Sequence, residues 1–227
     1  MPNLFSLPDP VAVPLVGQNA DFPIHRIFCV GRNYEAHARE MGNEVDRTAP
    51  WYFTKTPANA VLSGAQVGFP KATANYHHEI ELVIAIGTLA SDVDVSDAAD
   101  AIFGYGVGLD MTRRDLQAVS KEGRKPWCTG KDVENGAVFG DITPADDFTP
   151  ANQRIHVSVN DEIRQDASLA EMVWSCAEIV AHLSTLYVLH TGDLIMTGTP
   201  AGVGQVQPGD SIGGGIDGLA PVHLKLT

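Results

Sequence analysis

The amino-acid sequence predicts a mixed α/β fold that is β-rich, with many strands and few helices. From residue 79 onward, β-branched runs alternate with short segments of glycine and proline that are typical of turns. The strand-like segments outnumber the helix-like ones, and most of them lack the regular strand–helix alternation of a parallel α/β sheet. The 227 residues are enough to bury a substantial core in one domain or slightly more.

The net charge of the chain argues against two classes of partner. Lys and Arg number 15 and Asp and Glu number 28, which gives a formal net charge of −13 at pH 7. Nucleic-acid binding depends largely on neutralising phosphates, and an anionic membrane surface attracts basic segments, so we expect no nucleic acid and no membrane. A small anionic ligand is compatible with this charge if its site carries local positive charge.

The sequence predicts a cytoplasmic location. No apolar stretch reaches the roughly 18 residues that suggest a membrane span. Residues 1–17 lack the basic start of a signal peptide and contain several prolines and an aspartate. The three cysteines, Cys29, Cys128 and Cys176, are odd in number and widely separated, which favours reduced thiols over a disulfide framework.

The N-terminal third is rich in proline and turns, and we predict a small N-terminal region at 1–70 followed by a larger domain at 71–227. Within the first region, residues 25–31 predict a strand that ends at a glycine. Residues 33–42 predict a short helix that also ends at a glycine. A strand is expected again near residues 51–55.

The larger domain is expected to contain most of the strands. We predict strands at 79–87, 104–109 and 192–196, a turn followed by a further strand within 207–216, and a hairpin at 154–166 with an Asn-Asp turn. A capped helix is expected within 94–103. Residues 168–189 have helical spacing, with Ile179, Leu183 and Leu186 on one stripe.

Two glutamates lie in what is otherwise an apolar strand. Side chains at i and i+2 of a strand point to the same face, with Cα atoms ~6.5–7 Å apart. Glu79 and Glu81 therefore share a face, opposite a plainly apolar row that begins with Ile80. Two carboxylates so close repel each other unless a cation or a proton lies between them. The alternative is a strand end with two solvated glutamates.

Other residues are weaker candidates, each with an ordinary alternative. Asp110 ends a glycine-rich strand where a ligand can approach, or it caps the segment that follows. His37 and Glu40 are three residues apart on a predicted helix, the spacing of a carboxylate that supports a basic imidazole, or they are a surface pair. Lys131 can offset substrate charge or lie in an exposed loop. Residues 197–204 can hold a carboxylate or form a plain turn.

Five segments in this order carry a specific resemblance. They are CVGRNYEAHARE, HHEIELVIAIG, GYGVGLDMTRRDLQ, WCTGKD and GDLIMTGTPAGVG, and they span residues 29 to about 204. The chain resembles the fumarylacetoacetate hydrolase family in its short bacterial form. The resemblance implies a β-sandwich roll, a homodimer and a Mg²⁺ or Mn²⁺ site.

The resemblance also assigns roles by motif position. Glu79, Glu81 and Asp110 match the metal ligands, and His37 and Glu40 match a dyad that activates water from a lid over the site. The substrate-contacting positions of the family match Arg114, Gln117, Lys131 and Thr199. We expect Lys131 to act as a catalytic residue that stabilises an oxyanion. Arg32 is a further substrate-binding candidate, because it can offset substrate charge.

The implied reaction is hydrolysis of a C–C bond in an acylpyruvate, a small anionic 2-oxo acid. Residues 41–81 resemble bacterial proteins that act on fumarylpyruvate, a compound of the gentisate branch of aromatic degradation. Decarboxylation or isomerisation of a 2-oxo diacid is the alternative reaction, and a non-catalytic protein that binds 2-oxo acids is the alternative class. The segments FTKTP, KDVENG and GGGIDGLAPV depart from the family pattern, which bears on pocket shape and substrate choice.

Overall fold

Two β-sheets packed face to face form the body of the molecule in the computed structural model, which describes residues 4–6, 8–42, 44 and 47–227. The eight-stranded sheet has the order β4 (Trp51–Lys55), β3 (Arg26–Gly31), β15 (Asp193–Met196), β8 (Ile80–Ile86), β9 (Ile102–Asp110), β11 (Ala137–Phe139) and β5 (Ala60–Leu62), with β12 (Thr143–Pro144) also beside β9. The five-stranded sheet has the order β14 (Glu162–Ser168), β13 (Arg154–Val159), β17 (Ser211–Ile216), β18 (Val222–Leu226) and β6 (Ala65–Val67).

Smaller elements complete the fold. Two minor sheets contain β1 (Ala12–Pro14) with β2 (Asp21–Pro23), and β10 (Thr112–Arg113) with β7 (Tyr76–His78) and β16 (Gly204–Val206). The helices are α1 (Glu35–Glu40), α2 (Arg114–Glu122), α3 (Cys128–Lys131) and α4 (Cys176–Leu186), with 3₁₀ turns η1 (Pro57–Asn59), η2 (Ala98–Ala101) and η3 (Leu169–Glu171). The predicted β-rich fold with few helices is confirmed.

Strand β8 lies at the centre of the core because both of its faces are buried. Its even-numbered residues, from Ile80 to Ile86, belong to the large cluster between the two sheets. Val83 and Ala85 on the other face belong to a second cluster with residues of β3 and β15. A Cβ at Gly214 of β17 would lie 2.3 Å from Cδ1 of Ile80, so a glycine there lets the sheets approach.

The segment predicted as one helix at 168–189 is in fact two elements, η3 and α4. Each begins at a capping box. In such a box the serine hydroxyl accepts a hydrogen bond from a backbone N–H of the first turn, and the glutamate carboxylate accepts one from the backbone N–H of the serine. The boxes are Ser168 with Glu171 and Ser175 with Glu178. Leu186, expected on the buried stripe, is 55% exposed because it falls at the last residue of α4.

Two other expected helices are shorter than predicted. The helix at 33–42 is reduced to α1, and the capped helix within 94–103 is only the 3₁₀ turn η2, whose N-cap Asp97 makes no side-chain cap bond. Strand pairing limits the second of these, because Ile102 already pairs with Ile86 as the first residue of β9.

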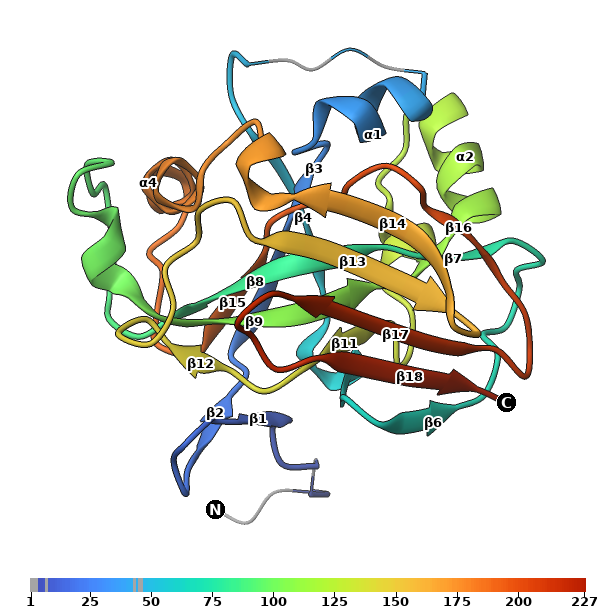
Figure 1. Ribbon diagram of the computed structural model, residues 1–227, viewed down its shortest axis with the longest axis horizontal. Coiled ribbons are helices and arrows are strands. Elements are labelled where there is room, and N and C mark those ends of the chain that lie inside the picture. Colours follow the sequence, from blue (N-terminus) through green and yellow to red (C-terminus); the bar gives the residue numbers. More distant parts are fainter. Residues whose placement is uncertain (1–3, 7, 43, 45–46) are drawn as a thin grey trace.

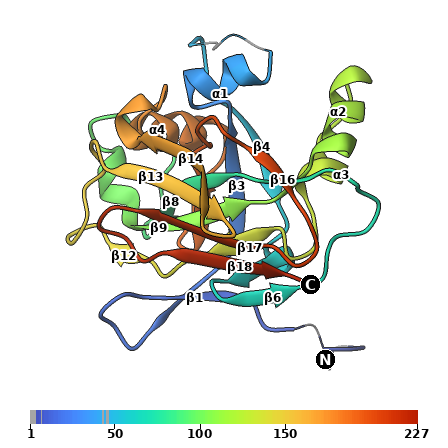
Figure 2. The same ribbon diagram turned by 45° about the vertical axis from the view of Figure 1, so that its right-hand side comes forward.

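Helices α1 and α2 stand at the same end of the eight-stranded sheet, as both views show (Figures 1 and 2). Strands β3, β4 and β5 from residues 1–70 share that sheet with β8 and β9 from residues 71–227. The division of the chain at residue 70 stays a prediction. Over the part of the chain that the structure describes, no helix has the length and apolarity needed to cross a membrane.

Candidate active site

Three buried carboxylates meet where β8 begins and β9 ends. The two strands pair antiparallel, with Glu81 opposite Gly108, and the N–H of Asp110 donates to the carbonyl of Glu79 at 2.8 Å. This register brings Asp110 beside the two glutamates, and one oxygen from each of the three carboxylates lies within 4.8 Å of the others. All three residues are at most 4% exposed, so the alternative of two solvated glutamates is wrong.

Two of the carboxylates form ion pairs with buried cations. Lys131 Nζ donates to Glu79 Oε2 at 2.6 Å and to Asp110 Oδ2 at 2.5 Å, while Lys55 Nζ lies 2.8 Å from Asp110 Oδ1. The guanidinium of Arg114 also donates to Glu79. Burial raises the pKa of Glu79, but Lys131, Arg114 and His37 together lower it further than burial raises it. Lys131 is 3% exposed, so the alternative of an exposed loop lysine is wrong.

Glu81 differs from its two neighbours. Its Oε2 accepts a hydrogen bond from the backbone N–H of Gly198 at 2.7 Å, and it forms no ion pair within the residues described. Burial first, and then the charges of Asp110 and Glu79, raise its pKa well above the ordinary value. Gly198 has φ +97°, and a Cβ on it would lie 2.7 Å from Cβ of Asn33, so only glycine brings this N–H to the carboxylate.

The three carboxylates fit a hard divalent cation. Mg²⁺ and Mn²⁺ prefer oxygen ligands, and all three residues offer carboxylate oxygens within one cluster. Glu81 is the one member of the triad that has no ion pair among the described residues, and a bound divalent cation would supply that partner. Glu79, Glu81 and Asp110 are therefore the residues that would hold the metal.

The His37–Glu40 pair predicted from spacing is formed in α1. His37 Nδ1 lies 3.2 Å from Glu40 Oε2, which leaves Nε2 for a ligand or a water. His37 is 7% exposed. Burial lowers its pKa, and the charges of Glu79 and Glu40 offset only part of that effect. The Glu40 carboxylate also accepts from the N–H of Gly202 at 3.1 Å, which ties α1 to the loop that follows β15.

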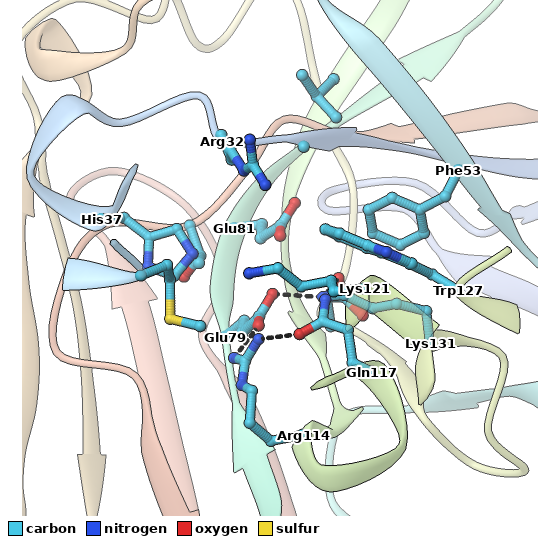
Figure 3. A pocket seen from close by; sticks show the side chains of 15 residues that line it. Arg32, His37, Phe53, Glu79, Glu81, Arg114, Gln117, Lys121, Trp127 and Lys131 are labelled. Atoms are coloured by element: carbon cyan, nitrogen blue, oxygen red, sulfur yellow. Dashed lines mark hydrogen bonds and ion pairs between the residues drawn. The ribbon is translucent and has the colours of Figure 1, made fainter. Parts of the chain in front are cut away.

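These groups line a single pocket between α1, α2 and the sheet (Figure 3). Nine of the ten residues singled out from the sequence line it, and the tenth, Glu40, bonds His37. The nine are Arg32, His37, Glu79, Glu81, Asp110, Arg114, Gln117, Lys131 and Thr199. Phe53 and Trp127 form an aromatic wall on one side, with ring centroids 6.1 Å apart. The structure thus brings residues from five sequence segments to one place.

Several contacts limit what each pocket residue can do. Gln117 Oε1 accepts from Arg114 at 2.6 Å, which aims its amide NH₂ elsewhere. The Thr199 hydroxyl accepts from Gln165 at 2.8 Å. The Thr197 hydroxyl donates to the carbonyl of Leu82 at 3.0 Å, so it supports the loop instead of holding a ligand. Asp110 is the last residue of β9 and not the N-cap of α2, which is Arg113.

Sequence reasoning missed Lys55, Lys121 and Gln165 as parts of the site. Lys55 lies in the departing segment FTKTP, and its Nζ also donates to the carbonyl of Lys131. The next residue, Thr56, donates through its hydroxyl to Asp132 at 2.6 Å. Two of the segments that depart from the family pattern therefore contact each other and jointly fix the two buried lysines. The two departures from the family pattern are visible in the sequence, but only the fold shows that the two segments contact each other.

The fold and this site define the class of protein. A model of the fumarylacetoacetate (FAA) hydrolase C-terminal family matches residues 26–226, so the chain belongs to this family. A fumarylpyruvate hydrolase from Ralstonia sp is 46% identical over 188 residues, which cover 82% of this chain and 98% of that protein. A mitochondrial oxaloacetate tautomerase from Arabidopsis thaliana is 39% identical over 202 residues, 88% of this chain and 90% of its own.

A solved structure extends the similarity to the whole chain. The crystal structure of fumarylpyruvate hydrolase from Pseudomonas aeruginosa, in complex with Mn²⁺ and pyruvate, matches with a TM-score of 0.95 and 41% identity. The match covers 100% of this chain and 99% of that one. The resemblance drawn from five sequence segments, and the β-sandwich roll that it implied, are confirmed.

Proposed function

We propose that this protein is a metal-dependent hydrolase that cleaves a C–C bond in an acylpyruvate, with fumarylpyruvate as the substrate and fumarate and pyruvate as products. One observation carries the proposal. A buried carboxylate triad, one member of which has no ion pair among the described residues, lies in the same pocket as a histidine that a glutamate orients. The similarity to a fumarylpyruvate hydrolase supports this choice of substrate.

The metal, held by Glu79, Glu81 and Asp110, would supply a Lewis acid at the 2-oxo acid end of the substrate. The chain's own residues do the rest. His37 takes a proton from water through Nε2, and Glu40 fixes the ring and stabilises the imidazolium that forms. The third N–H of Lys131 and the amide NH₂ of Gln117 are free to donate to the oxygen that becomes negative.

The bonds balance without a redox partner. Water adds its hydroxyl to the acyl carbonyl carbon, and the bond between that carbon and C3 of the pyruvate unit breaks. The electron pair stays with C3, which then takes the proton held by His37. Arg114 and Lys131 already balance Glu79, whereas Arg32, which also lines the pocket, has no ion pair among the described residues and can offset substrate charge without breaking an internal pair.

The test is to follow the near-ultraviolet absorbance of fumarylpyruvate with purified protein and Mg²⁺ or Mn²⁺, with and without EDTA, and to assay pyruvate at the end. We expect a metal-dependent loss of absorbance with one pyruvate formed per substrate consumed. Loss of absorbance without pyruvate would overturn hydrolysis as the reaction.

Tautomerisation or decarboxylation of a 2-oxo diacid such as oxaloacetate is the second candidate, and the similarity to oxaloacetate tautomerases favours it. Both reactions proceed through an enolate and need no hydrolytic water. The products separate the candidates, because only hydrolysis gives pyruvate together with a second acid. A non-catalytic protein would bind oxalate and the metal but turn over neither compound.

Finer statements go with the proposal. We propose Mg²⁺ or Mn²⁺ as the metal, a homodimer as the assembly, and a cytoplasmic enzyme of the gentisate branch as the setting. The Mn²⁺ in the Pseudomonas aeruginosa structure supports the choice of metal. Light scattering of the purified protein tests the dimer, since a monomer mass would contradict it.

A further inference from the structure

Lys121 stands one helical turn beyond the substrate-contacting residues of α2. Arg114, Gln117 and Lys121 are spaced i, i+3 and i+7, so they share one face of the helix, and all three line the pocket. Arg114 and Gln117 bond each other beside the carboxylates. Lys121 continues the same row one turn further along α2. Figure 3 shows its side chain within the pocket, together with that of Arg32 from the opposite side.

Lys121 and Arg32 are cations without an anion. Neither forms a hydrogen bond or an ion pair with any residue that the structure describes, although both are partly buried. Burial first, and then the charges of Arg32 and Arg114, lower the pKa of Lys121, and no carboxylate offsets them. The chain has a net charge of −13, yet this pocket holds two cations without a carboxylate partner. Their mutual repulsion and partial burial raise the free energy of the empty pocket, and an anionic ligand would offset that increase.

The backbone holds Arg32 toward the pocket. Arg32 has φ 57°, in the left-handed region that a residue with a Cβ seldom adopts. On one side, a Cβ at Gly31 would lie 2.0 Å from the Trp51 ring, so the chain packs flat against that indole. On the other side, Asn33 donates to the carbonyl of Thr197 at 2.8 Å and accepts from Trp174 at 2.7 Å. The strained residue is therefore fixed between two anchored neighbours.

We propose that Arg32 and Lys121 form a second anion subsite, which binds the carboxylate at the far end of a dicarboxylic acyl group. The inference rests on the proposed function and deepens it, because it assigns the residues that select acylpyruvates with a terminal carboxylate. The inner cations Lys55, Lys131 and Arg114 are already paired with the triad, and the wall of Phe53 and Trp127 offers an acyl chain apolar contact. Charge for a distal carboxylate is supplied by Arg32 and Lys121.

The test compares a substrate that has the distal carboxylate with one that lacks it. Lys121→Met is assayed with fumarylpyruvate and with acetylpyruvate. Loss of a charge-assisted hydrogen bond predicts a fall of about ten- to a hundredfold in kcat/KM for fumarylpyruvate, mostly through KM. For acetylpyruvate, kcat/KM stays within about threefold. Lys121→Arg keeps the charge and restores most of the preference, and Lys125→Met, an exposed lysine beyond the end of α2, removes the same charge without effect.

The outcomes separate the subsite from the proposed function. Equal losses for both substrates, or no loss for either, would overturn the subsite while leaving hydrolysis intact. If the wild-type protein hydrolyses neither compound, the proposed function fails. The subsite is then tested by calorimetry, which measures the binding of fumarylpyruvate and of acetylpyruvate to the wild type and to Lys121→Met. A Kd that Lys121→Met weakens only for fumarylpyruvate supports it, and equal affinities contradict it.

Discussion

The inner and outer ends of the pocket handle charge in opposite ways. At the inner end, Lys55, Lys131 and Arg114 each contact Glu79 or Asp110, and every contact is buried. At the outer end, Arg32 and Lys121 have no anionic partner among the described residues. Both ends contain cations of the same types, so the residue types alone do not distinguish them.

The difference separates groups that hold the site together from groups that remain available to a ligand. A buried ion pair is strongly destabilised when one partner is removed, because the other charge is left in a medium of low polarity. Replacing a partly exposed cation that has no partner changes the stability of the fold little. Its main effect is on the binding of a ligand. Within the inner end, Glu81 resembles the outer cations, because it also has no ion pair among the described residues.

The largest expected effect is on the reaction itself. His37→Ala removes the proposed base, and we expect turnover of fumarylpyruvate to fall about 10²–10⁴-fold. Calorimetry should show unchanged Mg²⁺ affinity, since His37 is not among the triad carboxylates. His190→Ala, which changes an exposed histidine elsewhere, is the control. Retained turnover in His37→Ala would refute the assignment of the base.

Lys55→Met breaks the inner end directly. Lys55 is 3% exposed and lies 2.8 Å from Asp110, so its loss should destabilise the fold by about 3–5 kcal/mol. Chemical denaturation measures this. Lys121→Met at the outer end should change stability by less than about 0.5 kcal/mol. Similar changes in the free energy of unfolding for the two variants would contradict the difference in stabilisation proposed for the two ends.

Glu81→Gln replaces the triad carboxylate that has no ion pair among the described residues, while keeping the shape of the side chain. We expect Mg²⁺ affinity to fall at least about a hundredfold, the upper end of what loss of a supporting contact alone costs a metal site. Isothermal calorimetry gives the Kd, and Glu134→Gln, which changes an 80%-exposed glutamate, is the matched control. An unchanged Kd for Glu81→Gln would place the metal elsewhere.

The smallest expected effect is on the pH dependence. His37 acts as a base only when it is neutral, and burial lowers its pKa from the ordinary 6.5. Activity is therefore lost as pH falls, with the acid limb of kcat/KM below pH 6.5. Glu40 raises the pKa of His37, so Glu40→Gln should move that limb to still lower pH. A limb at or above pH 6.5 in the wild type would argue against His37 as the titrating base.

Local spacing predicted the site better than it predicted the helices. The i, i+2 rule placed Glu79 and Glu81 on one face, and the i, i+3 rule paired His37 with Glu40, because both relations depend only on neighbouring residues. The prediction of one helix at 168–189 was wrong, and the reason also lies in the local sequence. The two Ser-x-x-Glu boxes at Ser168 and Ser175 mark two separate starts.

The sequence by itself determined the family, the β-rich character and the carboxylates of the candidate metal site, since these depend on residue types, order and short-range periodicity. Only the tertiary structure decided which cations would be paired. Lys55 reaches Asp110 across 55 residues of chain, and Lys121 reaches no anion in the part of the chain described here. The reason is physical, because the surroundings of a long cationic side chain are set by which strands and helices pack beside it, and no local pattern encodes that packing.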